Sequence, residues 1–262
     1  MVIVILGVIG SMAAVFMKGP IDAYFASARR AALTDVADTT LRRMTRDIHK
    51  ALPNSLRTPG TQCVEFIPTK TGGRYRTTEI AAGDNTSLDF SVVDATFNML
   101  GSNVALPANQ RIAVNDLIVV YNLGIAGADA YNNDNTATVL ALGAETAAPI
   151  ETPIILNPGM QFPLPSGNNR FHVVPAAEQV VGYVCSGGNL RRYTHALPYP
   201  APAVCPTPAG TDPILASNVS TCAFNFNGPD LQRNALIRMT LGLTDSDETV
   251  TLHHEVHVSS TP

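Results

Sequence analysis

The chain has 262 residues, which is enough for one large domain or two small ones with a sizeable core. Charged residues make up 15% of the chain, against roughly 25% in typical soluble proteins. The formal net charge is −4, and no basic stripe runs along the chain. We therefore expect no nucleic-acid partner.

Residues 1–17 (MVIVILGVIGSMAAVFM) contain no charged side chain and predict an apolar helix. Such a helix spans about 25 Å, the short limit for crossing a bilayer core of about 30 Å. Gly19 and Pro20 follow Lys18 and predict a helix kink, because proline lacks a backbone donor. The side chains expected in the membrane are those of Val2, Ile3, Val4, Ile5, Leu6, Val8, Ile9, Val15 and Phe16.

Residues 18–52 predict an amphipathic continuation of the same helix, which ends before Pro53. Basic side chains, among them Arg42, Arg43, Arg46 and Lys50, occupy the opposite face. Such a row is typical of a solvated helix face, and the alternative is a grip on anionic lipid or an acidic partner. The apolar face expected to pack on the head consists of Leu33, Ala37, Leu41, Met44, Ile48 and Leu52.

Residues 53–262 predict a β-rich body with proline-rich connections at 143–169 and 196–213; the first is mostly irregular, although residues 154–156 could pair as a strand. The clearest signal is a hairpin formed by 180–185 and 190–193 around Ser-Gly-Gly-Asn. Gly72 and Gly73 predict a turn. Further strands are expected at 63–67, 74–78, 87–93, 116–121, 171–174, 214–226, 235–243 and 249–258.

Four cysteines lie in this body: Cys63, Cys185, Cys205 and Cys222. An even count at wide spacing favours disulfides in an oxidising compartment over a metal site, and buried free thiols are the alternative. Four cysteines allow three connectivities. We favour Cys185 with Cys205, which would close the proline-rich loop between them, and Cys63 with Cys222.

The order of these segments resembles that of type IV pilins. Residues 1–10 are similar to the stretch that follows the processing site of a class III signal peptide. Residues 31–57 and 250–259 resemble minor pilins of the MSHA pilus type (MshO-like) and, more distantly, the large minor pseudopilins of type II secretion. The resemblance implies an α+β, type IV pilin-like fold whose long N-terminal helix packs on an antiparallel β-sheet head. Its parts would be an apolar membrane or filament-core half (1–17), an amphipathic half (18–52) and a globular head (53–262).

The function that this resemblance implies is that of a structural minor pilin, not an enzyme, in the assembly or initiation of a pilus. Its partners would be other major and minor pilins, the inner membrane before assembly, and the pilus assembly platform. The head would be periplasmic on a single-pass helix and would later join the assembled pilus. The family's basic leader and Phe-Thr-Leu-Ile-Glu-like start are absent. We therefore expect Met1 to lie several residues inside the mature helix, and no residue takes the role of that Glu.

Two clusters suggest metal chemistry, each with an ordinary alternative. His253, Glu255 and His257 would share one face of a strand, but the run lacks the His-Glu-x-x-His spacing of zinc proteases. The loop that starts at Asp129 offers clustered oxygens without the ligand spacing of an EF-hand. We expect a solvated strand face and ordinary turn chemistry, with no metal, no cofactor and no catalytic residue.

Two other classes of function stay open. The chain could be a secreted or membrane-anchored β-rich binding or adhesion protein with an ordinary signal segment. A metal-dependent hydrolase that uses the strand from His253 to His257 is the third class.

Overall fold

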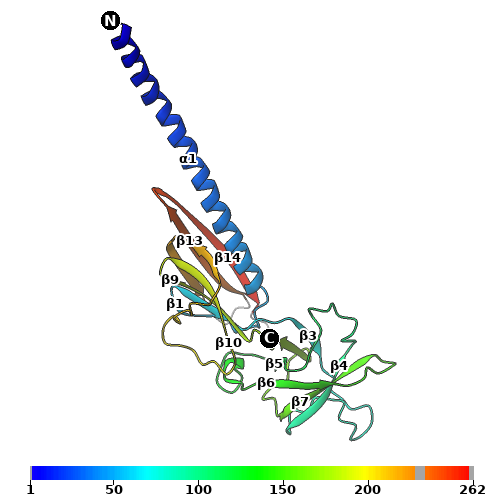
Figure 1. The fold of residues 1–262 in the computed structure, drawn as a ribbon. Helices are drawn as coiled ribbons and strands as arrows, with labels where there is room; N and C mark the ends of the chain where they lie inside the picture. The colour runs from blue at the N-terminus through cyan, green and yellow to red at the C-terminus, as the bar shows by residue number, and fades with distance from the viewer. Residues whose placement is uncertain (1, 228–233, 260–262) are drawn as a thin grey trace.

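The computed structural model describes residues 2–227 and 234–259 (Figure 1). Over those residues the chain forms one long helix, one 3-10 turn and fourteen strands. Helix α1 spans Val2–Ile48 and turn η1 spans Ala130–Asn132. The strands are β1 (Arg57–Gly60), β2 (Cys63–Phe66), β3 (Thr71–Arg74), β4 (Asp94–Leu100), β5 (Leu117–Val120), β6 (Thr136–Leu142), β7 (Glu151–Met160), β8 (Arg170–Val174), β9 (Val180–Ser186), β10 (Asn189–His195), β11 (Ile214–Ser217), β12 (Val219–Asn227), β13 (Asn234–Asp245) and β14 (Glu248–Ser259).

Helix α1 is continuous through Gly19 and Pro20 and projects far beyond the rest of the molecule (Figure 1). At its C-terminal end the amides of Lys50 and Ala51 bond to carbonyls three residues back, which tightens the last turn. Pro53 lacks the amide needed to continue the helix.

The end of α1 packs into a lobe made of two antiparallel sheets, which we call the base lobe. One sheet has the order β1-β2-β9-β10-β11 and the other has the order β12-β13-β14. Hairpin β13–β14 runs alongside the lower part of the helix (Figure 1). Helix and sheets share one core, which includes Leu41, Met44, Ile48, Phe66, Tyr183, Ile237, Met239 and Val256.

The β9–β10 hairpin confirms the strongest local expectation. Its strands pair directly from Ser186 opposite Asn189, so the loop is Gly187-Gly188. Both glycines have positive φ, 56° and 73°, which a two-residue hairpin turn requires. Gly182 is needed for a different reason: a Cβ there would lie 2.1 Å from the Tyr193 ring.

Residues 69–175 form a second lobe, which we call the inserted lobe because the base lobe continues on both sides of it. Strands β2 and β9 pair with each other, with Phe66 opposite Val181. A few residues further on, Thr71 of β3 lies opposite Val173 of β8. The chain thus leaves and re-enters the base lobe through adjacent antiparallel segments, as inserted domains do.

The inserted lobe is a six-stranded antiparallel sheet, β3-β8-β5-β6-β7-β4, that curves into a half-barrel, so that its two edge strands approach each other. A bridge joins Tyr75 and Met99, and the Arg76 amide donates to the Asn98 carbonyl at 3.0 Å. The Arg76 guanidinium also pairs with the buried Glu151 carboxylate. The lobe has its own core, which includes Leu88, Phe97, Ile112, Ile118, Val139, Ile154, Phe162, Phe171 and Val173.

The predicted α+β, pilin-like fold class is wrong. The chain is mainly β, and its three antiparallel sheets are divided between two lobes; the sheet of the inserted lobe is a half-barrel. The expectation was a long helix packed on one antiparallel β-sheet head. The helix contributes to a core over its last turns only, because no described side chain from Val2 to Ala32 is buried. The expectation failed because the helical pattern ends at Leu52 and carries no information on how the following strands divide.

Several local strand expectations are also wrong. Residues 75–78 lie outside β3, and the single strand expected at 214–226 is two strands, β11 and β12, in different sheets. Gly72 and Gly73 do not form a turn but lie within β3, where a Cβ on Gly73 would lie 2.7 Å from the Phe171 ring. The expected strand at 87–93 is irregular, and β4 begins only at Asp94. In that segment the Asp89 carboxylate accepts a bond from the Ser91 amide at 2.7 Å, and this local turn competes with strand pairing.

Candidate functional site

The most unusual surface of the molecule is the free part of α1. Phe16 is 83% exposed and Tyr24 is 71% exposed, although such side chains are normally buried. The side chains of Ile3, Val4, Val8, Ile9 and Val15, also expected on this surface, lie outside the described ones. We define the apolar helix surface by its exposed large residues: Val2, Ile5, Leu6, Met12, Phe16, Met17, Ile21, Tyr24 and Phe25. Large apolar side chains exposed in such number mark a contact site with another apolar surface.

Among the described residues, no helix combines the length and the apolarity needed to cross a membrane.

The C-terminal part of the helix has a buried face. Leu33, Ala37 and Leu41 are buried against the base lobe, followed by Met44 and Ile48. Leu52 lies just past the helix end, in a small cluster with Ile67, Val119 and Val180 that joins the two lobes.

All four cysteines form disulfides, but both favoured pairings are wrong. Cys63 bonds Cys205, and Cys185 bonds Cys222. The first bond fastens the proline-rich loop after β10 to β2, and the second ties β9 of one sheet to β12 of the other. Sequence spacing could not give this result, because partners depend on which strands become neighbours. The two disulfides indicate an extracellular or periplasmic location.

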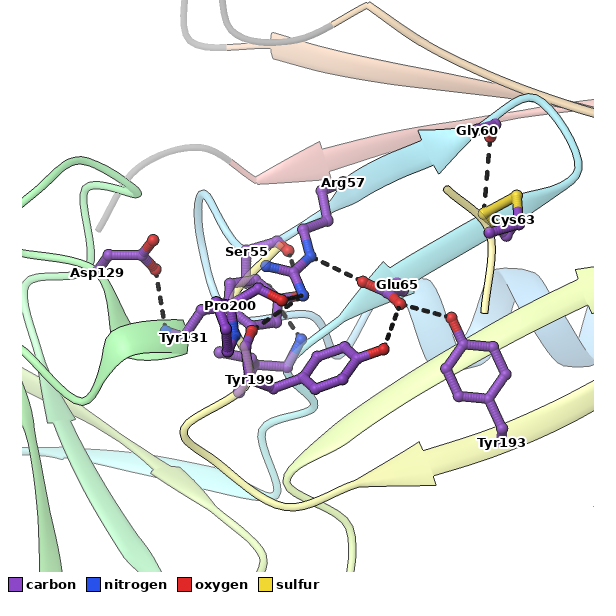
Figure 2. Close-up of polar contacts among 12 residues, drawn as sticks. Ser55, Arg57, Gly60, Cys63, Glu65, Asp129, Tyr131, Tyr193, Tyr199 and Pro200 are labelled. Atoms are coloured by element: carbon purple, nitrogen blue, oxygen red, sulfur yellow. Dashed lines mark hydrogen bonds and ion pairs between the residues drawn. A yellow bond between two sulfur atoms is a disulfide. The ribbon is translucent and has the colours of Figure 1, made fainter. Parts of the chain in front are cut away.

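Close to the junction of the lobes lies a buried polar group that the sequence did not reveal (Figure 2). The Glu65 side chain is 0% exposed and accepts from Arg57 Nε at 2.8 Å, Tyr193 Oη at 2.7 Å and Tyr199 Oη at 3.3 Å. The Arg57 guanidinium stacks on Tyr131 of the inserted lobe, 3.5 Å from the ring centre. We call Arg57, Glu65, Tyr131, Tyr193 and Tyr199 the tyrosine latch.

The electrostatics of the tyrosine latch favour a structural role. Burial and the neighbouring Glu65 carboxylate raise the pKa of Tyr199 to about 12. The same two causes raise the pKa of Tyr193, and burial raises that of Tyr131. These hydroxyls therefore stay protonated at neutral pH and serve as hydrogen-bond donors. The only sequence signal was an acidic residue inside the apolar run Cys63-Val-Glu-Phe-Ile.

Neither candidate metal cluster becomes a ligand set, and the described ranges contain no group of three ligands that could hold a metal. On β14, the His253 ring bonds Thr240 Oγ1 at 3.0 Å, and Glu255 pairs with Arg238 at 2.7 Å. In the other cluster, the Asp129 carboxylate accepts from the Tyr131 amide at 2.9 Å.

A cavity of about 420 Å³ lies where the end of α1 meets both lobes. Its charged walls are largely paired with one another. Glu178 binds Arg192 through two contacts of 2.8 Å, and Asp47 accepts from Tyr183 Oη at 2.5 Å. Lys70, also in the wall, pairs with Asp116. This arrangement braces the junction and favours no particular ligand.

Comparisons with family models, curated proteins and solved structures found no match to this chain.

Proposed function

We propose that this chain is a structural subunit, a minor pilin that takes part in the assembly or initiation of a type IV (MSHA-like) pilus. The observation that carries the proposal is the apolar helix surface, which stands clear of a folded, disulfide-bonded head. The likeness of residues 31–57 and 250–259 to minor pilins supports the same class. No catalytic, cofactor or metal role forms part of the proposal.

The free energy gained by burying apolar side chains favours association of the apolar helix surface with other helices. Burying one large apolar side chain contributes about 1.5–3 kcal/mol, so side chains such as Leu6, Met12 and Phe16 together drive association strongly. In a fibre, helices of other major and minor pilins would cover them, with close packing in place of lipid contacts. Before assembly this half of α1 would lie in the inner membrane, with the head in the periplasm beside the assembly platform.

Deletion of the gene provides the first test. We expect pili to be lost or sharply reduced while the major pilin is still made, because an initiating subunit is needed before the major pilin can polymerise. Pilus counts by electron microscopy and immunoblots of the major pilin measure the two quantities. Normal pilus numbers in the deletion strain would contradict the proposal.

Charge insertion on the helix provides the second test. Phe16→Asp places a carboxylate in the apolar helix surface, which should exclude the chain from pili because a buried unpaired charge is costly. Ser27→Asp adds the same charge at an exposed polar position of the same helix and should enter pili normally. Equal recovery of both variants in sheared pili would count against the proposed contact.

A further inference from the structure

Two groups of exposed charges of opposite sign lie at different heights of the base lobe. The turn between β13 and β14 carries Asp245 and Asp247, which we call the acidic tip. Arg43 and Arg46 lie three residues apart in the last turns of α1, and Lys50 follows in the turn just after the helix; we call these three residues the basic row. Within the described part of the chain, none of these five side chains forms an ion pair.

Two carboxylates, those of Asp47 and Glu178, lie beside the basic row, and both are paired with Arg192. Arg43 and Lys50 lower the pKa of Glu178, so this carboxylate lies within their field. Glu178 is nevertheless bound through both of its oxygens by Arg192. The basic row therefore keeps its charge available for an outside partner.

The heights of the two groups along the helix follow from one contact. Glu248, next to the acidic tip, pairs with Arg30 of the helix. The acidic tip thus lies at the level of Arg30, and it points toward the free end of α1 (Figure 1). From Arg30 to Arg46 is about 24 Å along the helix, at ~1.5 Å per residue.

We infer that the acidic tip of one copy of this chain contacts the basic row of a second copy, displaced by about 24 Å along a parallel helix. This inference rests on the proposed function, because it assumes that the helices lie parallel in a fibre. The contact joins different surfaces of the two copies, so it does not close on itself and extends into an open array. The occupant is a second copy because the chain supplies both halves of the charge complementarity.

The contact determines the relative position of the two copies more than it determines the affinity between them. Exposed ion pairs are individually weak, and salt screens them over about 8 Å at physiological ionic strength. Charge complementarity mainly speeds encounter and fixes register. The apolar helix surface supplies the attraction, and the charges select which stagger of the two helices is adopted.

Cysteine cross-linking tests the contact directly. A full-length chain with both Arg46→Cys and Asp247→Cys should form a ladder of disulfide-linked multimers in cells that assemble pili. Each single variant should give dimers at most, because one cysteine per copy cannot extend a chain of links. A double variant with no products beyond dimers would overturn the inference.

Charge reversal tests the electrostatics of the same contact. In the two-cysteine chain, Arg43→Glu should lower the ladder yield by about tenfold through slower encounter, and adding Asp245→Lys should restore it. As a control, Arg170→Glu makes the same charge change at an exposed position of the inserted lobe and should leave the ladder unchanged. If Arg43→Glu does not lower the ladder yield, or if Asp245→Lys does not restore it, these charges do not set the stagger of the two helices and the inference is wrong.

The same experiment separates failure of this inference from failure of the proposed function. If the unmodified chain never enters pili, the proposed function fails. Purified full-length chain in detergent still reports on the copy-to-copy contact, and rising salt should lower its ladder yield. If the chain enters pili but no ladder forms there, the register fails and the proposed function stands.

Discussion

Glu65 combines complete burial with a formal negative charge, which a folded chain tolerates only when the charge is fully bonded. Its carboxylate accepts from a guanidinium and from two tyrosine hydroxyls (Figure 2). Arg57 extends the group to the inserted lobe through its stacking on Tyr131, with an attraction of about 1–2 kcal/mol when such a pair is desolvated. One strand residue thus ties together segments that are far apart in the sequence.

Replacing Glu65 by Gln should lower the free energy of unfolding by about 3 kcal/mol, because Arg57 is then left partly buried without its counter-charge. Glu255→Gln is the matched control, since Glu255 pairs with Arg238 on the solvated face of β14 and should matter by less than about 1 kcal/mol. Urea unfolding of the two variants at neutral pH measures both values. Equal losses would show that the tyrosine latch adds nothing beyond a surface pair.

At the scale of single elements, helix α1 combines two surfaces of opposite character. Its last turns bury a face at three- and four-residue spacing into the base lobe, while its first two thirds keep large apolar side chains exposed. Helices in folded proteins gain most of their stability from such packing. The free part therefore depends on a partner for its stability, and the packed part depends on the head.

Two methionines of the same helix separate these surfaces. Met44 is 1% exposed and Met12 is 68% exposed. Met44→Ala should destabilise the head by about 2–5 kcal/mol, because it leaves a cavity between the helix and the sheets. Met12→Ala should leave head stability unchanged within about 0.5 kcal/mol. Thermal unfolding of both purified variants gives the comparison, and a large loss for Met12→Ala would mean that the free part of α1 also packs on the head.

The elements differ in how far the sequence could predict them, for physical reasons. The face from Leu33 to Ile48 and the hairpin at Gly187-Gly188 follow from local periodicity and turn geometry, so both were predictable. Bonds such as Cys63–Cys205 and contacts such as Tyr193–Glu65 depend on which distant strands meet. At 87–93, apolar alternation predicted a strand, but the Asp89 carboxylate accepts a hydrogen bond from the Ser91 amide and forms a local turn instead.

For the whole molecule, the interruption of the base lobe between β2 and β9 is the main organising feature. All four cysteines belong to the base lobe, and the inserted lobe has a core of its own. The two lobes meet at three places: the tyrosine latch, the cavity with paired charges at the end of α1, and a small apolar cluster around Leu52, Ile67 and Val180. The inserted lobe lies at the end of the molecule opposite the free part of α1 (Figure 1).

This organisation predicts that the inserted lobe can be removed without unfolding the base lobe. Replacing residues 69–175 with a short Asn-Gly linker keeps Phe66 beside Val181, so the β2–β9 pairing survives. We expect both native disulfides to form, with stability lowered by a few kcal/mol because Ile67 and Val180 become exposed. Non-reducing peptide mapping and circular dichroism provide the measurement. Scrambled disulfides, or a shortened chain without strand signal, would show that the base lobe needs the insertion to fold. A separately expressed inserted lobe that unfolds cooperatively would establish that its core is self-sufficient.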